Sequence, residues 1–224
     1  MTPLEYKLHF DRIIERVEKA RLRLNDHHIV KIVAASKYVD SEAIKALYAI
    51  GQRAFGENKV QDLVAKSEAL EDLPIEWHFI GNLQKNKINH LLACNPSLIH
   101  SIDSLELALA LNDRLERENK NLRALVQVNS AYEETKNGFL PEELNEKYVQ
   151  IAETCPRLKL QGLMSIGAHV DDPKRIQKSF ETTRTLFDSL KGATVCSMGM
   201  SSDFELAIEC GSTMIRLGSV LFPK

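Results

Sequence analysis

The sequence predicts a single α/β domain over residues 1–224, folded as a closed (β/α)8 TIM barrel. Three observations support this fold. Short apolar runs alternate with amphipathic segments along the whole chain, a pattern typical of parallel β-α units. Eight such runs occur, and 224 residues lie within the limit of about 250 that one hydrophobic core supports. An open doubly wound sheet is the alternative that the alternation by itself also permits.

An opening helix precedes the first predicted strand. Apolar residues recur at helical spacing from Phe10 to Leu24, and Asn25 with Asp26 interrupts the pattern. Only residues 219–224 follow the last predicted strand, which is too short a segment for an outer helix. We therefore expect the opening helix to fill the eighth place in the ring of helices.

The first β-α unit sets the pattern that the rest of the chain repeats. The run IVKIVAAS at 29–36 is followed by Lys37, then by Asp40 and Ser41 as a helix cap and by a helical stripe up to Gly51. The connection at 130–147 is expected to be a loop leading into a helix that starts near Pro141. The other seven strands are predicted in RAFGEN (53–58), EWHFIG (76–81), SLIHSID (97–103), RALVQVNS (123–130), LKLQGLMSIG (158–167), ATVCSMG (193–199) and STMIRLG (212–218).

Composition narrows the classes of function. A formal net charge of −2 disfavours binding to nucleic acid or to an anionic membrane. No apolar run approaches the roughly 20 residues that span a bilayer, and the amino-terminal segment is charged throughout, so we expect a cytoplasmic protein. The cysteines form no CxxC pair, which predicts no metal site and reduced, mostly buried thiols at Cys94, Cys155, Cys196 and Cys210.

Lys37 is the leading candidate for covalent chemistry. Active sites of these barrels lie at the carboxyl ends of the strands, and Lys37 closes the first apolar run. Strand alternation places it on the same face as Val33 and the small Ala35, which leaves room for a ligand ring. A lysine desolvated there has a lowered pKa and supplies the neutral amine that Schiff-base formation requires. A solvated lysine that caps a strand is the simpler alternative.

Serine and glycine residues follow the last two predicted strands, where such barrels often hold a phosphate. The segment SMGMSSDFELAIECG at 197–211 leads into a short helix capped by Ser202 or Asp203, and Gly218 with Ser219 forms a second loop. Backbone N–H groups and hydroxyls at such loops can bind an anion. Plain capping of the helix is the alternative interpretation of the first loop.

Arg216 lies inside an apolar run, where an ion pair across the barrel is its simplest role. Facing a pyridine nitrogen, the guanidinium would instead donate a hydrogen bond and keep that nitrogen unprotonated, which makes the ring a weak electron sink. His78 is either a satisfied interior histidine or a site residue. Further candidates for lining the site are Asn58, Met164 and Asp103, whereas Lys85 and Lys87 are interpreted as a solvated helix start.

Several stretches together are specific for one family: VAASK (33–37), FGENKVQD (55–62), WHFIGNLQKNK (77–87), VQVNSAYEETKNGF (126–139), GLMSI (162–166) and SMGMSSDFELAIECGSTMIRLGSVLF (197–222). In these stretches the chain resembles the pyridoxal phosphate homeostasis proteins, also called the proline synthase co-transcribed family. It departs from the family pattern at Tyr38, at Asn82 and in its LFPK ending. These departures bear on local loop shape more than on the cofactor.

The resemblance implies a barrel similar to the N-terminal domain of alanine racemase, the type III fold of proteins that use pyridoxal 5'-phosphate (PLP). It implies PLP bound as an internal aldimine on Lys37, with Arg216 facing the pyridine nitrogen. The residues implied to line the phosphate or lie near the cofactor are Ser197, Ser201, Gly218, Ser219, Asn58 and His78.

The function implied by the resemblance is carriage of PLP in intracellular PLP homeostasis. Members of the family lack the separate β-domain that completes a racemase site, so catalytic turnover is not expected. The expected partners are PLP and PLP-requiring apo-enzymes, without nucleic acid or membrane, and the expected state is a monomer. Two alternatives stay open: a PLP-dependent amino-acid racemase or lyase of low activity, and a phosphate-binding barrel enzyme without an aldimine.

Overall fold

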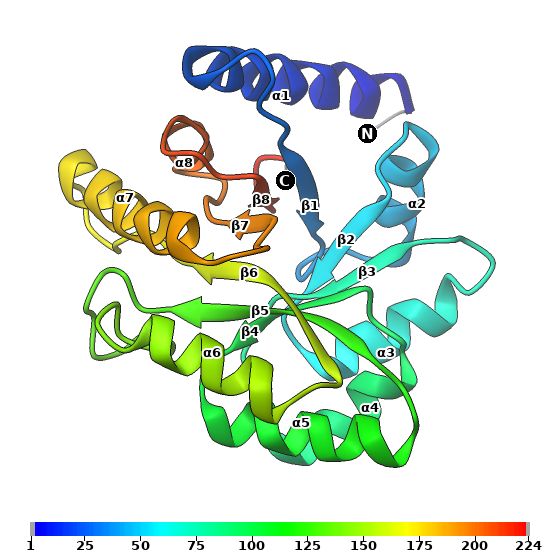
Figure 1. The fold of residues 1–224 in the computed structure, drawn as a ribbon. Helices are drawn as coiled ribbons and strands as arrows, with labels where there is room; N and C mark the ends of the chain where they lie inside the picture. Colours follow the sequence, from blue (N-terminus) through cyan, green and yellow to red (C-terminus); the bar gives the residue numbers. More distant parts are fainter. Residues whose placement is uncertain (1–2, 223–224) are drawn as a thin grey trace.

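The structure is a computed structural model that describes residues 3–222, and its centre is a closed barrel of eight strands (Figure 1). All neighbouring strands pair in parallel and in chain order, and β1 also pairs with β8, so the sheet has no free edge. This confirms the predicted fold class. The strands are β1 Lys31–Ala35, β2 Ala54–Glu57, β3 Glu76–Phe79, β4 Leu98–Ile102, β5 Leu122–Val128, β6 Leu158–Ser165, β7 Val195–Ser197 and β8 Met214–Leu217.

Helices surround the barrel and connect consecutive strands. Over residues 3–222, no helix combines the length and the apolar character that crossing a membrane requires. The helices are α1 Pro3–Leu24, α2 Ser41–Ala49, α3 Val60–Ala69, α4 Ile88–Ala93, α5 Leu105–Arg117, α6 Leu144–Thr154, α7 Pro173–Ser189 and α8 Phe204–Glu209, with a 3-10 helix at Lys85–Lys87.

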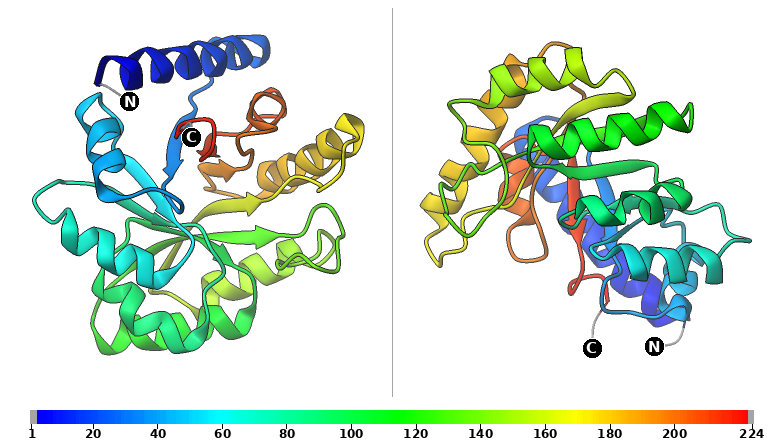
Figure 2. Two further views of the ribbon diagram at one scale, coloured as in Figure 1. Left: turned by 180° about the vertical axis from the view of Figure 1, so that it is seen from behind. Right: turned by 90° about the horizontal axis from the view of Figure 1, so that it is seen from below.

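The opening helix α1 occupies the eighth place in the ring, as predicted. It packs against α8 and α2 (Figure 1), and Figure 2 shows it beside the last segment of the chain. Arg16 on α1 pairs with Glu205 on α8 at 2.9 Å, and His9 Nε2 lies 2.6 Å from the carbonyl oxygen of Val220. The segment after β8 therefore docks on α1 instead of forming a helix of its own.

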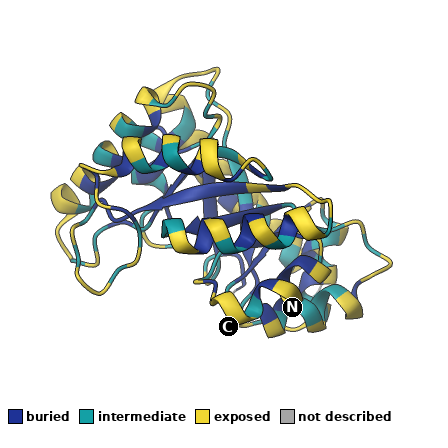
Figure 3. Cartoon of the chain, turned by 60° about the horizontal axis from the view of Figure 1, so that its bottom comes forward, coloured by how far each residue is buried: buried dark blue, intermediate teal, exposed yellow. Residues whose placement is uncertain are grey.

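Two apolar clusters hold the barrel together. The larger one lies between strands and helices, where each helix buries one face and exposes the other (Figure 3). Fully burying a side chain of leucine or valine size contributes about 1.5–3 kcal/mol, so this layer is the main stabilising contact of the fold. The smaller cluster consists of Val33, Ala54, Leu98, Leu125, Met164 and Met214 from six different strands. Strand alternation places it inside the barrel.

Besides shifts of one or two residues at strand ends, the structure differs from the sequence predictions in the start of α6, the length of β7 and the way that Asp203 caps α8. Helix α6 begins at Leu144 instead of near Pro141, because residues 141–143 form a turn in which Glu143 Oε1 accepts the backbone N–H of Leu140. Strand β7 is only three residues long, since the chain turns at Gly199, whose φ is +96°. Asp203 occupies the N-cap position of α8, but its carboxylate accepts the N–H of Met200 at 2.6 Å, outside the helix.

Candidate functional site

Lys37 lies one residue past Ser36 at the carboxyl end of β1. Register places Ala34 of β1 opposite Leu217 of β8, so Lys37 and the loop after β8 share one end of the barrel. The lysine is half-buried, which is less than the desolvation expected for a lysine inside an apolar site. Its Nζ lies 4.9 Å from the centre of the Tyr38 ring, and no residue of 3–222 forms a hydrogen bond or ion pair with it. Within residues 3–222, the Tyr38 ring is therefore the only side chain that contacts this amine.

A buried ion pair lies behind Lys37, in the layer between barrel and helices. Glu57, at the end of β2, is fully buried, and its Oε1 accepts the Ser36 hydroxyl at 2.6 Å and Lys66 Nζ at 2.7 Å. Lys66 also donates to the carbonyl oxygen of Ser36 at 2.7 Å. Because Lys66 lies on α3, Ser36 and Glu57 face the layer of helices. The ion pair therefore joins the two strand ends that Lys37 and Asn58 follow.

Asn58 is placed by a close backbone contact. A Cβ atom built on Gly81 would lie 2.0 Å from the carbonyl oxygen of Asn58, so only glycine fits in the segment that follows β3. Asn58 is half-buried. The close approach of these two segments fixes the position of Asn58 near the barrel mouth.

Arg216 is almost fully buried and makes no ion pair with any described residue, so an ion pair across the barrel is not its role. Its Nη1 donates to the carbonyl oxygen and the hydroxyl of Ser197 at 2.9 and 2.7 Å, and its Nη2 donates to the carbonyl oxygen of Ser165 at 2.8 Å. Burial lowers the pKa of Arg216 to about 10, which leaves the guanidinium charged at neutral pH. The Nε–H and the second Nη2–H have no partner among residues 3–222.

The two serine- and glycine-containing loops meet, as their positions after β7 and β8 suggest. Ser201 Oγ accepts the backbone N–H groups of Gly218 and Val220 at 3.1 and 3.4 Å. Ser219, between them, is exposed. The Ser201 hydroxyl thus holds the second loop in shape, a role that the sequence does not indicate.

His78 is fully buried and is one of a pair. Its Nε2 lies 3.0 Å from Glu76 Oε1 and its Nδ1 lies 2.8 Å from Nε2 of His100, which in turn approaches the Ser197 hydroxyl at 3.2 Å. Burial is the main cause that lowers the pKa of both histidines, that of His100 well below its usual range. The hydrogen bond from His78 is the main cause that lowers the pKa of Glu76 to about 2.

Sequence reasoning missed His100, Glu76 and Lys31. The available signal was the same for His100 as for His78, a histidine at the centre of an apolar strand. Two further candidates, Met164 and Asp103, do not belong to this group of hydrogen-bonded side chains. Met164 belongs to the apolar cluster inside the barrel, and Asp103 is half-buried at the end of β4, where burial raises its carboxyl pKa.

The cysteine thiols are poor candidates for nucleophiles. All are free, and burial raises the pKa of Cys196 to about 12 and that of Cys210 to about 11. Burial also raises the pKa of Cys94 and Cys155. Because the thiolate is the reactive form, none of these thiols is activated for nucleophilic attack.

Comparison of the sequence and of the structure with known proteins supports the same barrel fold. Residues 8–223 match the family model "Alanine racemase, N-terminal domain". The chain is 60% identical over 221 residues to the pyridoxal phosphate homeostasis protein of Helicobacter pylori strain J99, with 99% of this chain and 100% of that protein covered. The crystal structure of an unknown protein from Bifidobacterium adolescentis has a TM-score of 0.91 at 32% identity, covering 98% of this chain and 95% of that one.

A further solved structure is PipY of Synechococcus elongatus PCC7942 with PLP bound, which has a TM-score of 0.80 at 34% identity and covers 93% of this chain and 98% of that one. The closed barrel and the matching family model define this protein as a barrel of the alanine racemase N-terminal type. Within that class, the chain belongs to the family of pyridoxal phosphate homeostasis proteins.

Proposed function

We propose that this protein binds PLP covalently through Lys37 and takes part in intracellular PLP homeostasis without catalytic turnover. The observation that carries the proposal is a lysine amine without a hydrogen bond or ion pair just after β1, beside strand β8, which holds the buried, cationic Arg216. The PLP-bound structure of the 34% identical PipY supports the choice of cofactor.

The residues present fit PLP in their chemistry. Arg216 has N–H groups without protein partners, which suits a pyridine nitrogen that accepts a hydrogen bond. The loops joined by Ser201 supply hydroxyls and backbone groups beside the end of β8, which suits a phosphate. We therefore assign the phosphate to the loops around Ser201, Gly218 and Ser219, and the face of the ring to Asn58. Ser197 and His78 are 0% exposed and their polar atoms have protein partners, so we assign them to the support of Arg216 and not to contact with the cofactor.

The proposed covalent step needs no additional reactant. Lys37 would hold PLP through a carbon–nitrogen double bond between its amine and the aldehyde carbon, and the aldehyde oxygen would leave as one water molecule. Bound PLP supplies an electron sink for amino-acid chemistry, but a sink that is weak when the pyridine nitrogen stays unprotonated. Arg216 can only donate, so it would hold that nitrogen in its unprotonated form. This favours storage of the cofactor over turnover.

Reductive trapping tests the covalent bond. Borohydride treatment of the PLP-loaded protein should leave a pyridoxyl adduct on the peptide that contains Lys37, and Lys37→Ala should abolish it. Lys59→Ala, which alters an exposed lysine next to Asn58, is the matched control and should keep the adduct. An adduct that persists in Lys37→Ala, or wild-type protein without one, would reject the proposal and favour a phosphate-binding barrel without a Schiff base.

A panel of L-amino acids tests the absence of turnover. The loaded protein should neither racemise them nor exchange their α-protons with solvent deuterium above the rate of free PLP. Exchange well above that rate would favour the racemase or lyase alternative. Transfer of the cofactor to apo-enzymes, a cytoplasmic location and a monomeric state belong to the same proposal.

A further inference from the structure

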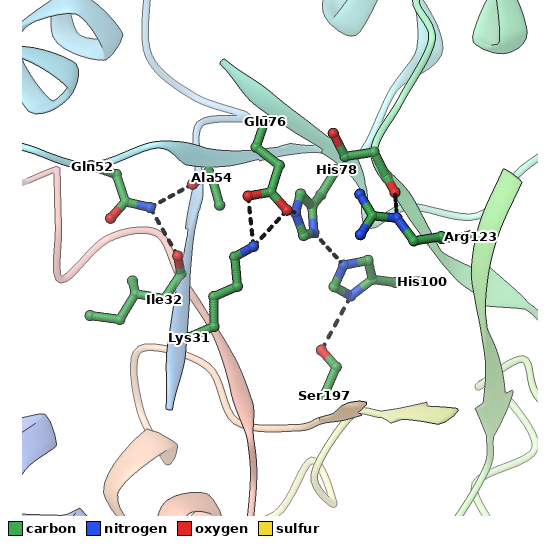
Figure 4. A network of polar contacts seen from close by, with 10 residues as sticks. Lys31, Ile32, Gln52, Ala54, Glu76, His78, His100, Arg123 and Ser197 are labelled. Carbon is green, nitrogen blue, oxygen red and sulfur yellow. Dashed lines mark hydrogen bonds and ion pairs between the residues drawn. The ribbon is translucent and has the colours of Figure 1, made fainter. Parts of the chain in front are cut away.

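A row of polar side chains crosses the interior of the barrel, and the proposed function does not use most of it. Figure 4 shows it running from the ion pair of Lys31 and Glu76, 2.5 Å apart, to Ser197. His78 Nε2 lies 3.0 Å from Glu76 Oε1. His78 Nδ1 lies 2.8 Å from His100 Nε2, and His100 Nδ1 lies 3.2 Å from Ser197 Oγ. Four strands, β1, β3, β4 and β7, contribute to this row.

The surroundings of this row are apolar. His78, His100 and Ser197 are each 0% exposed, and the same interior holds the cluster around Val33 and Met164. A polar group buried in such a place costs free energy unless it is hydrogen-bonded. Every ring nitrogen of the two histidines has a partner within the row, so the row satisfies itself.

The direction of each hydrogen bond follows from the two ends. Glu76 is ionised and can only accept, so His78 carries its proton on Nε2. Burial keeps both imidazoles neutral, so His78 Nδ1 accepts from His100 Nε2–H, and His100 Nδ1 accepts from the Ser197 hydroxyl. At the other end, Arg216 can only donate, and it donates to Ser197 Oγ at 2.7 Å. Each hydrogen bond of the row therefore has one donor and one acceptor.

We propose that Glu76, His78 and His100 are positioning residues, and that their hydrogen-bond chain fixes the Ser197 hydroxyl and, through it, the guanidinium of Arg216. Without an acceptor at His100, the Ser197 hydrogen would have no fixed direction, and the oxygen would not present its lone pair to Nη1 of Arg216. The consequence for the cofactor rests on the proposed function, because the guanidinium held in this way is the one assigned to the pyridine nitrogen. The Lys31–Glu76 ion pair anchors the far end.

The first test needs no cofactor. In protein labelled with 15N on histidine, at neutral pH and without PLP, His78 and His100 should both appear as neutral rings with the proton on Nε2 and the lone pair on Nδ1. A proton on Nδ1 of either ring, or an imidazolium signal from either one, would overturn the chain. This measurement is independent of whether Lys37 binds PLP.

The second test compares two variants of His100 in the loaded protein. His100→Leu breaks the chain, whereas His100→Gln keeps both an acceptor and a donor. We expect His100→Leu to shift the absorbance band of the bound cofactor and to weaken its retention on dialysis about fivefold, the effect of losing one ordinary hydrogen bond. His100→Gln should recover most of both, and His90→Leu, at an exposed histidine, should leave both unchanged.

Folding is monitored separately by thermal unfolding. If His100→Leu is less stable but binds with the wild-type spectrum and retention, its role is only structural and the proposal is wrong. If wild-type protein gives no pyridoxyl adduct, the proposed function fails, and the nitrogen signals without cofactor still decide whether the chain has the proposed direction.

Discussion

Ser36 forms hydrogen bonds with both members of the ion pair between Glu57 and Lys66. Its hydroxyl donates to Glu57 at 2.6 Å, and its carbonyl oxygen accepts a hydrogen bond from Lys66 Nζ at 2.7 Å. The residue that follows it is Lys37. Because Lys66 lies on α3 and Glu57 on β2, the arrangement ties the end of β1 to its neighbouring strand and helix. The backbone just before Lys37 is thus held by a buried ion pair on the helix side of the sheet.

Removing one partner of this buried pair should destabilise the protein strongly. Lys66→Met leaves the Glu57 carboxylate, 0% exposed, without a counter-ion, and losing one member of a buried pair costs about 3–5 kcal/mol. The measurement is the free energy of unfolding in urea. Lys59→Met, at an exposed lysine just before the same helix, should change it by less than about 0.5 kcal/mol.

The double variant Lys66→Met with Glu57→Gln should recover part of the loss, since no unpaired charge remains buried. If Lys66→Met proves as mild as Lys59→Met, the ion pair does not stabilise the end of β1, and its link to Lys37 has to be abandoned.

Gly81→Ala tests the contact that places Asn58. The added Cβ would lie 2.0 Å from the Asn58 carbonyl oxygen, so the two segments must separate, and overpacking of this kind costs about 1–3 kcal/mol. We expect a loss in this range in urea unfolding, together with weaker PLP retention because Asn58 moves. A wild-type unfolding midpoint and wild-type retention would contradict the contact.

Gly192→Ala is the matched control for Gly81→Ala. Gly192 has a φ of +78° but no atom within 4 Å of an added Cβ, so alanine meets backbone strain there without a clash. It should cost about 1–2 kcal/mol of stability and leave PLP retention unchanged. If Gly192→Ala also retained PLP less well, PLP retention would follow the stability of the fold and not the position of Asn58.

The sequence pattern was sufficient to predict the features that depend on neighbouring residues along the chain. Alternating runs located all eight strands, and the position of Lys37 at the end of the first one placed it at the barrel mouth. Arg216 stood out as a charge inside an apolar run. The start of α6 was misplaced because a turn stabilised by Glu143 Oε1 resembles the first turn of a helix in sequence.

The pattern was insufficient where a role depends on a distant partner. The contact of His100 with Ser197 joins residues 97 positions apart, and it exists only because barrel closure directs both strands inward. Likewise, the sequence predicts that Ser201 lines a phosphate, whereas the hydrogen bond from the Gly218 N–H to its hydroxyl, which shapes the neighbouring loop, depends on a partner 17 residues away. Such partners follow from strand register, which the local sequence does not encode.

The free energy of unfolding should fall in acid over two pH ranges, both with the same sign. The pKa values of His78 and His100 are lowered in the folded state, so the unfolded chain binds protons first, and stability falls as the pH drops below the ordinary value of 6.5. The pKa of Glu76 is lowered from 4.5 to about 2, so its contribution is present above pH 4.5 and is lost between pH 4.5 and about 2.

Urea unfolding at a series of pH values measures this dependence. Glu76→Gln should flatten the decline below pH 4.5, whereas Glu146→Gln, at an exposed carboxylate with a surface partner, should change it less. Stability that stays constant from pH 7 to pH 5 would show that the two histidines are not buried as neutral rings.

Ser201→Ala should weaken binding of the phosphate more than binding of the ring. The Ser201 hydroxyl accepts the N–H groups of Gly218 and Val220, and without it the loop after β8 loses its fixed shape at the place assigned to the phosphate. Losing the acceptor of these two part-buried N–H groups costs about 1–2 kcal/mol. Affinity for PLP should therefore fall about tenfold, while affinity for pyridoxal, which has no phosphate, should fall less than twofold.

Equilibrium dialysis with both vitamers measures the ratio of the two affinities, and Ser202→Ala, at the exposed neighbouring serine, should leave this ratio unchanged. Equal losses for PLP and pyridoxal in Ser201→Ala would place the phosphate elsewhere, because a loop that binds the phosphate cannot affect both vitamers alike.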